Sequence, residues 1–508
     1  MATEMVPHTA LTLVDQLPAF QILASFLAAP LIVVLGSRRL AWPIAFIASA
    51  MSLIVALMLL SQVMDGTVIS YRMGGWAPPL GIEYRVDAAN AFVLVLVSAI
   101  STLILPYART SFGKEIPLRH HTAFYAAYLL CFSGLLGVTI TGDAFNVFVF
   151  LEVSSLSTYV LIAMGAERDK RALTAAYDYL IMGTIGATFF VIGIGFLYMA
   201  TGTLNMADIA DRIVEQGGNR TIRAGFAFIV VGIGLKVAMY PLHRWLPNAY
   251  TYAPSAVTAF VAATSTKVAV YVLLRFIFSV FQPNFLFEFN TLEYIILPFA
   301  LIAMFAASFV AIFQSDFKMM LAFSSIAQIG YILLGIAFLT ETGVTAAVVH
   351  LFNHGITKAA LFMAVGAYVF SANGSYYDTI QGLGRRMPLT SAAVVLAGFS
   401  LIGVPGTAGF VSKWVLVQAA LEKGWWPVAL LIVASSLLAV IYVWRVIEVL
   451  YLRATPQGCQ VREAPASMLV PMWIAVLACI YFGLNTDLTI GAAETAARGL
   501  MSGSAGMR

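Results

Sequence analysis

The sequence predicts an all-α polytopic membrane protein, and three observations support that prediction. Of the 508 residues, 61% are hydrophobic and only 10% are charged, whereas roughly 25% of the residues in soluble domains are charged. The mean hydropathy of the chain is +0.91. Apolar windows recur along the chain, and many reach the roughly 20 residues that a helix needs to cross a bilayer. These observations exclude a soluble enzyme, a disordered chain and a fibrous protein.

About 14 of these windows are expected to form transmembrane helices, with no soluble domain between them. Two windows contain proline and glycine in positions that break a helix, and these two are expected to be irregular: 224–248 and 389–421. The expected spans are 19–36, 41–63, 88–107, 122–141, 144–165, 174–201, 224–248, 254–281, 293–313, 319–339, 343–370, 389–421, 427–452 and 467–484.

The longest polar insert between spans covers residues 64–87. Its Gly and Pro clusters and alternating residues predict a small surface hairpin. The first residues of the chain lack a basic segment before an apolar one, so the first span is expected to remain in the mature protein. The expected organisation is an N-terminal three-helix segment with the hairpin (1–121), two five-helix units (122–281 and 282–453), and a C-terminal span with a tail (454–508).

Basic residues are unevenly distributed between the loops, and this predicts the topology. Loops after odd-numbered spans hold 14 Lys and Arg residues, and loops after even-numbered spans hold 6. Because cytoplasmic loops are enriched in Lys and Arg, both termini are expected on the outer side. The net charge of +4 is too small to indicate a nucleic-acid partner. The cysteines Cys131, Cys459 and Cys479 are far apart and indicate neither a disulfide framework nor a metal site.

The two irregular windows suggest an internal repeat. Lys236 is followed by Pro241, and Lys413 is preceded by Pro405 and by glycines. Lys267 in span eight follows Lys236 by 31 residues, and Arg445 in span thirteen follows Lys413 by 32 residues. Spans four to eight and nine to thirteen would then be two five-helix units, inverted because each holds an odd number of spans, as in many transporters. The alternative is that Pro and Gly are simply common in membrane helices.

Ionisable residues inside spans are the candidate functional groups, since a charge at the bilayer centre costs about 2.5–3.5 kcal/mol. Glu152 lies in the middle of span five, Lys236 in span seven and Lys267 in span eight. Burial disfavours a charged lysine and a nearby carboxylate favours it, so a Glu–Lys pair that opens and closes can make a lysine release or take a proton. The alternatives are a structural interhelical hydrogen bond for Glu152 and a snorkelling side chain for Lys236.

Span eleven carries His350, His354 and Lys358 at intervals of four, so that one stripe of the helix holds all three. Histidine titrates near physiological pH, which favours a proton relay. A metal or haem site is a second interpretation, although the zinc motif His-Glu-x-x-His is absent; helix-packing polarity is a third. Lys413 lies deep in span twelve, where snorkelling is a poor explanation.

Weaker candidates lie nearer the span ends. Asp178 stands near the end of span six, where interfacial solvation is an equal explanation, and His243 follows the break in span seven, where a structural role is an equal explanation. Arg445 and Glu448 are spaced to form a local ion pair in span thirteen. The chain has no phosphate-binding loop, dinucleotide fingerprint or Cys-x-x-Cys motif. No cofactor, metal or catalytic site of its own is therefore expected, and energy must come from partners or an ion gradient.

Several segments resemble one family closely. They are KVAMYPLHRWLPNAYTYAPSAVTAFVAATSTKVAVYVLLR, HLFNHGITKAALF, GVPGTAGFVSKW and WAPPLGIEYRVDAANAF. The chain resembles the antiporter-like subunits, which comprise the proton-pumping membrane subunits of respiratory complex I, their relatives in membrane-bound hydrogenases, and the large subunits of Mrp-type multisubunit cation/proton antiporters. The resemblance implies fourteen helices, two inverted five-helix repeats, broken seventh and twelfth helices and a hydrated polar axis at mid-membrane.

The resemblance also implies roles for individual residues. Glu152 matches the glutamate of the fifth helix, and Lys236 matches the lysine of the seventh. Lys267 matches the lysine of the eighth helix, which is histidine in some members. The eleventh-helix set is matched by His350, His354 and Lys358. Lys413 matches the twelfth-helix lysine, which does not suit the complex I member that has glutamate there.

Length and motifs resemble the D subunit of Mrp antiporters best. The implied function is proton translocation in a multisubunit cation/proton antiporter of the bacterial plasma membrane, with other membrane subunits, protons and Na⁺ as partners. Protons would pass from the Lys267 region along the histidine stripe to Lys413, with the Glu152–Lys236 pair as a switch. The alternative is a proton-pumping subunit of a redox-driven complex, and another class is a haem-binding membrane protein.

Overall fold

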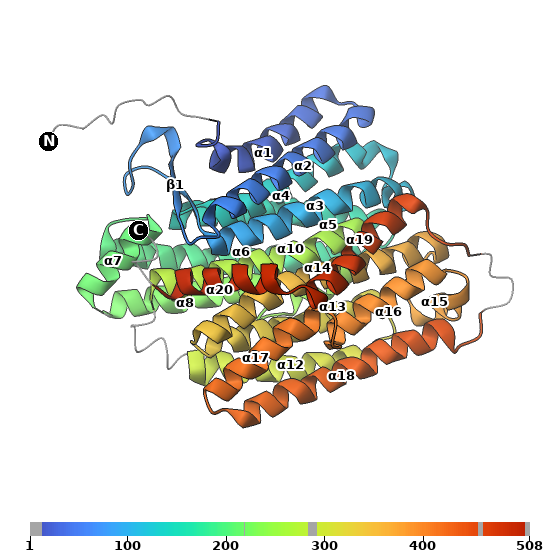
Figure 1. Cartoon of the computed structure of the whole chain (residues 1–508). Helices are drawn as coiled ribbons and strands as arrows, with labels where there is room; N and C mark the ends of the chain where they lie inside the picture. The colour runs from blue at the N-terminus through green and yellow to red at the C-terminus, as the bar shows by residue number, and fades with distance from the viewer. Residues whose placement is uncertain (1–12, 218, 283–291, 456–460, 503–508) are drawn as a thin grey trace.

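The computed structural model describes residues 13–217, 219–282, 292–455 and 461–502. Nearly all elements are helices that run along one common axis (Figure 1). In chain order they are α1 (Leu17–Leu35), α2 (Arg38–Val63), β1 (Ile69–Arg72), η1 (Met73–Gly75), β2 (Glu83–Val86), α3 (Ala88–Glu115), η2 (Leu118–His120), α4 (His121–Ile140), α5 (Ala144–Ala163), η3 (Met164–Glu167), α6 (Arg171–Thr201), α7 (Met206–Gln216), α8 (Arg220–Val237), α9 (Trp245–Tyr252), α10 (Ser255–Leu274), η4 (Arg275–Val280), η5 (Leu292–Ile296), α12 (Leu297–Ile312), α13 (Phe317–Ala337), α14 (Glu341–Ala372), α15 (Tyr377–Ile380), η6 (Leu383–Arg385), α16 (Pro388–Ile402), α17 (Ala408–Glu422), α18 (Trp426–Tyr451), α19 (Ala466–Leu484) and α20 (Asp487–Met501).

The polytopic all-α membrane architecture is confirmed. Within the described residues, 12 helices are long and apolar enough to cross a membrane. The other two predicted spans, 224–248 and 389–421, are the two that contain breaks: α8 is followed by α9, and α16 by α17. These twelve helices and the two interrupted spans account for the fourteen that the sequence predicts.

The bundle has two ends that differ in character (Figure 1). The predicted hairpin forms at one end, where β1 and β2 pair antiparallel with Ile69 opposite Val86. We call this end the hairpin face; α1 begins and α20 ends there. The loops with most Lys and Arg meet at the other end, where Arg168 binds the side chain of Asn373 at 3.2 Å and Lys114 binds the carbonyl of Phe370 at 2.7 Å. We call that end the arginine-rich face.

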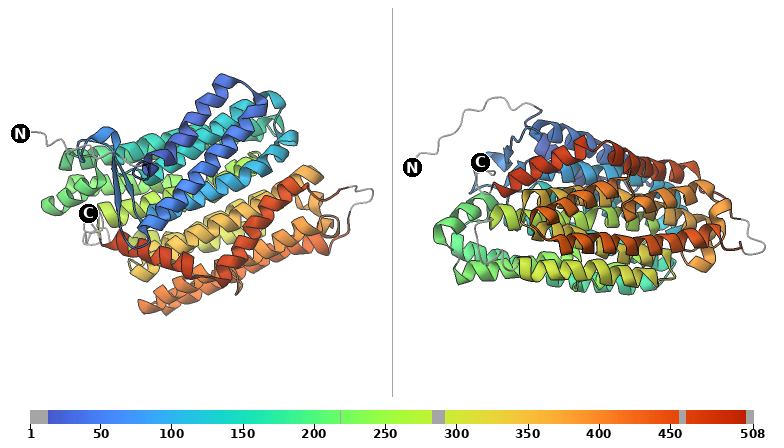
Figure 2. Two further views of the ribbon diagram at one scale, coloured as in Figure 1. Left: turned by 45° about the horizontal axis from the view of Figure 1, so that its top comes forward. Right: turned by 60° about the horizontal axis from the view of Figure 1, so that its bottom comes forward.

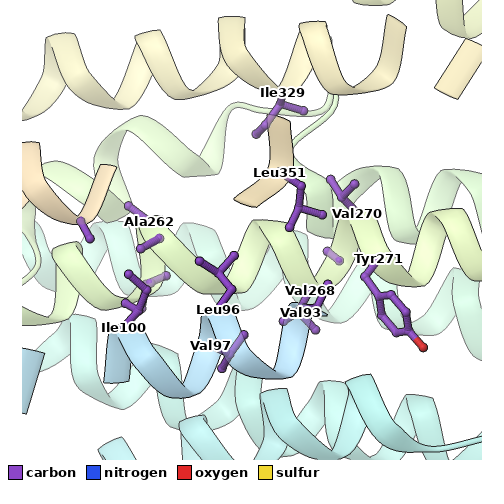
Figure 3. Packing of buried hydrophobic residues seen from close by; sticks show 14 of the residues in the cluster. Val93, Leu96, Val97, Ile100, Ala262, Val268, Val270, Tyr271, Ile329 and Leu351 are labelled. Carbon is purple, nitrogen blue, oxygen red and sulfur yellow. The ribbon is translucent and has the colours of Figure 1, made fainter. Parts of the chain in front are cut away.

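The core lies between α3, α10, α13 and α14. In the most apolar window of α10, 94% of the residues are buried, compared with 33% in α18, which lies at the edge of the bundle. Figure 3 shows Val93 and Leu96 of α3 packed among Val268 of α10 and Leu351 of α14. The helices that carry Lys267 and the histidine stripe are therefore mostly enclosed by other helices, with 94% and 83% of their most apolar windows buried.

Two short backbone bridges have the same form on opposite faces. At the hairpin face, Asp143 caps α5 and pairs with Asn205; at the arginine-rich face, Asp316 caps α13 and pairs with Tyr376. The partners are 62 and 60 residues apart. Two inverted units would produce equivalent contacts at opposite ends of the bundle, so these bridges support the predicted repeat. The division of the chain into units at residues 122, 282 and 454 stays our proposal.

Two helices lie outside the predicted spans. The first is α7, an amphipathic helix of 11 residues at the hairpin face that begins with Asn205 accepting from the backbone N–H of Asp208. The second is α20, which occupies most of what the sequence predicts to be a tail. It packs against α14 and α3. The start of the chain (1–12) and Cys459 lie outside the described residues, whereas Cys131 and Cys479 are free and buried.

Candidate functional site

Glu152 and Lys236 form an ion pair inside the bundle. The ammonium of Lys236 lies 3.3 Å from Oε1 of Glu152 and donates to Oγ of Ser155 at 2.7 Å. The side chain of Lys236 is 6% exposed and that of Glu152 is 22% exposed. Glu152 and Ser155 lie on successive turns of α5 and so present their side chains to α8 together. The two groups that the sequence predicts to be a pair are thus brought together.

The break after Lys236 has a local cause. Helix α8 ends at Val237 because Ala238 adopts the left-handed conformation, with φ of 60°, and Pro241 has no N–H to continue the helix. The freed carbonyl of Leu235 accepts from the indole N–H of Trp245 at 2.9 Å. That indole stacks on Tyr179 of α6. Irregular backbone at this depth is tolerated because protein groups bind it, and Lys236 lies in the last turn of α8, where the helix dipole favours a cation.

Lys267 lies on α10, buried with 1% exposure. Its ammonium donates to the carbonyl of Ala262 at 2.5 Å and to the hydroxyl of Thr266 at 3.3 Å. Across the described residues, no carboxylate forms an ion pair with it. A lysine held only by neutral oxygens can release its proton more readily than one that is paired with a carboxylate.

The histidine stripe faces α13 and α17. His350 contacts two side chains, with Nε2 2.9 Å from Oε1 of Gln328 and Nδ1 2.8 Å from Oγ of Ser412. His354 is stacked on His350 with ring centroids 6.0 Å apart. Neither ring nitrogen of His354 has a hydrogen-bond partner in the described part of the chain. His354 is buried on α14, which packs against α10 and α17, the helices of Lys267 and Lys413.

Two further lysines bind backbone carbonyls. Lys358, one turn after His354, donates to the carbonyl of Leu321 at 2.8 Å and to the hydroxyl of Ser324 at 2.5 Å. Lys413 donates to the carbonyls of Leu401 and Ile402 at 3.2 and 2.8 Å. Those carbonyls belong to the last turn of α16, and the C-terminus of a helix attracts a cation. The ring of Tyr331 lies 4.7 Å from the same ammonium.

The weaker candidates lie apart from this group. Asp178 is half-buried in α6, and His243 stacks on Tyr240 just after the break in α8. The predicted local pair of Arg445 and Glu448 is wrong: the guanidinium of Arg445 binds the carbonyl of Ile312, and Glu448 lies 3.3 Å from Nε of Arg453. Helical spacing permits the predicted pair, but neighbouring segments offer each side chain a partner.

A polar cavity that the sequence analysis missed opens at the arginine-rich face. It has a volume of about 240 Å³ and is lined by three buried charged residues, Glu115, Asp316 and Lys318. Glu115 accepts from the backbone N–H of Ser255 at 2.9 Å, and Lys318 donates to the carbonyl of Ala253 at 3.0 Å. All three stand at span ends, where charged residues are ordinarily solvated, so position alone gave no signal.

The cavity also has a charged rim. Arg171 binds the carboxylate of Asp169 through its side chain and lowers the pKa of that carboxyl group. A second missed pair lies at the hairpin face, where Arg275 reaches Asp87 at 2.7 Å with both side chains largely buried. The available signals in the sequence were two separate charges, Asp87 just before the third span and Arg275 inside span eight.

The family model described as NADH:quinone oxidoreductase/Mrp antiporter, TM matches residues 141–439, more than half of the chain. The chain belongs to this family.

Curated members of the NADH:quinone oxidoreductase/Mrp antiporter family match along much of their length. NADH-quinone oxidoreductase subunit N of Desulforudis audaxviator strain MP104C is 38% identical over 482 residues, which cover 91% of this chain and 95% of that protein. The putative antiporter subunit mnhD2 of Staphylococcus aureus strain JH9 is 32% identical over 399 residues, 78% of each chain.

Solved structures of the family have the same fold. A chain in the Mrp complex of Dietzia sp. DQ12-45-1b has a TM-score of 0.88 at 25% identity, with 97% of this chain and 98% of that chain covered. A chain of an archaeal membrane-bound sulfane sulfur reductase has a TM-score of 0.86 at 28% identity, with the same coverage. Respiratory complex I from Thermus thermophilus with bound aureothin contains a chain with a TM-score of 0.75 at 24% identity, covering 93% of this chain and 98% of that one, which is a likeness of fold.

In this chain, His350 and His354 of the histidine stripe are poorly placed to bind a metal ion. Both ring nitrogens of His350 already contact side chains. Within the residues that the structure describes, His, Cys, Asp and Glu side chains form no group of three that could hold a metal ion. The polar groups around the stripe are lysines, hydroxyl groups and the amide of Gln328.

Proposed function

We propose that this chain is the proton-translocating membrane subunit of a multisubunit monovalent cation (Na⁺)/H⁺ antiporter. The similarity to a putative antiporter subunit and to a chain of an Mrp complex supports this function. The chain works with other membrane subunits, as the similarity to multisubunit assemblies indicates. Its relatives in Desulforudis, Staphylococcus and Dietzia support a bacterial plasma membrane, and the uneven distribution of Lys and Arg supports termini on the outer side.

The single observation that carries the mechanism is the Glu152–Lys236 pair at the break of α8. While the pair is closed, the carboxylate stabilises the charged lysine. When the pair opens, a buried ammonium loses that stabilisation and tends to release its proton. Because the break leaves the last turn of α8 attached to only one half-helix, Lys236 can move relative to α5 without a shift of the whole span.

Within the histidine stripe, His350 can take up and give back a proton without moving its heavy atoms. Oε1 of Gln328 accepts from Nε2 of His350, so this nitrogen keeps its proton. The Ser412 hydroxyl has two acceptors within reach, Nδ1 of His350 at 2.8 Å and the carbonyl of Gly409 at 3.3 Å. Rotation of that hydroxyl toward Gly409 lets Nδ1 hold a proton, and rotation back lets Nδ1 accept a hydrogen bond. His350 therefore has a hydrogen-bond arrangement for each of its protonation states.

The axis runs across the bundle from Glu152 to Lys413. Protons enter through the Lys267 region, pass His354 and His350, and leave by Lys413. The cavity at the arginine-rich face supports an entrance on that side, because Ala253 and Pro254 of its wall immediately precede α10, the helix of Lys267. A second helix also links the cavity to the axis. Lys358 donates to the hydroxyl of Ser324 on α13, and the first turn of α13 holds the cavity residue Lys318.

The test is cation-dependent proton movement in everted vesicles that carry the whole complex, without a respiratory substrate. Wild-type vesicles should show sodium-induced dequenching of a pH-sensitive dye. Lys236→Ala should abolish the signal while the complex still assembles, and Lys170→Ala, an exposed lysine at the arginine-rich face, should leave it intact. Normal transport in both Glu152→Ala and Lys236→Ala would overturn the switch.

A second candidate function has its own supporting observation. The relative at 38% identity is a subunit of an NADH-quinone oxidoreductase, so the same axis could be driven by electron transfer in partner subunits. Vesicles that ignore sodium but pump protons when a redox donor is added would favour this function. The roles of Glu152, Lys236 and the histidine stripe would be the same in either complex.

A further inference from the structure

The last span of the chain contains a third break. Helix α19 ends at Leu484 and α20 begins at Asp487, with Asn485 and Thr486 outside any helix. In Figure 1 and Figure 2, α20 continues from the end of α19 toward the hairpin face. The two helices together form one membrane crossing with an interruption inside it.

The break lies deep in the membrane region. Arg498, near the end of α20, lies 3.8 Å from Glu341 at the start of α14 on the hairpin face. Asp487 precedes Arg498 by 11 residues, which is about 16 Å along a helix. The hydrocarbon core is about 30 Å thick, so the break is close to its middle. The contact of Phe482 with Phe352, with ring centroids 5.3 Å apart, agrees with this depth, because Phe352 lies in the fourth turn of α14.

One side of the break is covered and the other is open. On the covered side, Gly483 lies directly against the backbone of Gly406 and Thr407, in the break between α16 and α17. On the open side, Tyr481 is 55% exposed, Leu484 73% and Leu488 53%. Asn485 and Asp487 are exposed between them. We call these five residues the break surface: Tyr481, Leu484, Asn485, Asp487 and Leu488.

Lipid is a poor neighbour for the break surface. No side chain caps the first turn of α20, and the carboxylate of Asp487 forms no ion pair with any part of the chain that the structure describes. Irregular backbone at membrane depth occurs where protein or water covers it, not where it faces lipid. A carboxylate at the bilayer centre is likewise found facing protein and paired. The flanking stripe of exposed apolar side chains is the kind of surface that a neighbouring helix covers.

We propose that the break surface docks a transmembrane helix of another subunit, and that this helix presents a lysine or arginine to Asp487. The negative charge at mid-membrane selects a basic partner residue, and the apolar stripe on either side supplies the packing. The position against the α16–α17 break, which carries the carbonyls that bind Lys413, places the partner helix beside the end of the proton axis. The proposal rests on the proposed membership in a multisubunit complex, although its test does not use transport.

The test is photocrosslinking in native membranes that contain the whole complex, with a photoreactive amino acid in place of Leu484. The expected product is a crosslink to a different membrane subunit, with a residue within reach of a Lys or Arg of its transmembrane helix. Crosslinks to lipid alone, or to a second copy of this chain, would overturn the proposal. If the crosslink to another subunit forms but the complex shows no cation-dependent proton transport, the result would contradict the proposed function and still support the docking proposal.

Substitution of the carboxylate gives an independent readout. Asp487→Leu should lower the amount of partner subunits that co-purify with the tagged chain by roughly 3- to 30-fold, the range of polar contacts between membrane helices. Asp487→Asn keeps hydrogen bonding and should lower it less. Glu494→Leu is the matched control, because Glu494 is exposed on the same face of α20 two turns nearer the hairpin face. Recovery of partner subunits at the wild-type level with Asp487→Leu would contradict the proposal. If Asp487→Leu fails to fold, the crosslinking experiment still tests the proposal, because it keeps Asp487.

Discussion

The ammonium of Lys413 lies 2.8 Å from the carbonyl oxygen of Ile402, so the second half of a broken span binds the end of the first half. The two half-helices are α16 and α17, and the break between them exposes carbonyls that no backbone N–H can reach. The lysine thereby supplies the hydrogen bonds that the break removed. The same group is the terminal proton carrier in the proposed path, so structure and transport depend on one side chain.

Two variants of Lys413 separate these roles. Lys413→Leu leaves the carbonyls of Leu401 and Ile402 without a donor and should destabilise the protein by about 1–3 kcal/mol. Lys413→Arg can still donate to them but stays charged at all accessible pH values, so it should keep near-normal thermal stability and lose proton transport. Unfolding temperature of the purified complex and dye dequenching in vesicles measure the two effects. Active transport with arginine would rule out a protonation change at this position.

The Glu152–Lys236 pair should show strong coupling in a double-mutant cycle. Either Glu152→Gln or Lys236→Met removes one charge and leaves the other buried without its partner, which costs about 3–5 kcal/mol for a buried pair; the partial exposure of Glu152 places the expected value at the lower end. The double variant should be less destabilised than the sum of the single variants, by about 1–3 kcal/mol. Thermal unfolding of the four proteins measures the coupling, and additive effects would mean that the two charges do not depend on each other.

The two histidines should differ in their structural importance. His350→Leu removes the donor to the buried Oε1 of Gln328 and should cost about 1–3 kcal/mol, whereas the hydroxyl of Ser412 can still donate to the carbonyl of Gly409. His354→Leu breaks no hydrogen bond between described residues, so stability should change by less than about 1 kcal/mol. If the stripe is a relay, proton transport should fall in both variants. Full transport in the stable His354→Leu variant would exclude that residue from the path.

Close backbone contact at the α16–α17 break predicts a sharp difference between two glycines. A Cβ atom at Gly409 would overlap the carbonyl oxygen of Ser400, whereas nothing lies within 4 Å of a Cβ at Gly491 in α20. Gly409→Ala should therefore destabilise the protein by about 1–3 kcal/mol, and Gly491→Ala should stabilise it slightly, since alanine favours a helix by about 1 kcal/mol over glycine. Equal unfolding temperatures for the two variants would show that the half-helices can separate at little cost.

Much of the architecture follows from composition and spacing. Apolar windows interrupted by single charges predicted the fourteen spans, because a bilayer leaves few alternatives to an apolar helix of about 20 residues. Proline and glycine near Lys236 and Lys413 predicted both broken spans, since these residues prevent a helix from continuing. The pairing of Glu152 with Lys236 was predictable for the same reason, as each charge in a span needs a partner.

The sequence by itself determined which segments cross the membrane, that the spans of Lys236 and Lys413 break, and which of their groups are ionisable, because these depend on local chemistry and on the bilayer as solvent. Only the tertiary structure decided which of those groups meet. The contacts of His350 with Gln328 and Ser412 join residues 22 and 62 positions away, and the cavity around Glu115 and Lys318 joins segments from five parts of the chain. The tertiary structure also determined which arginine pairs with Glu448 and that α20 packs as a helix, since helix packing selects one contact among several that spacing allows.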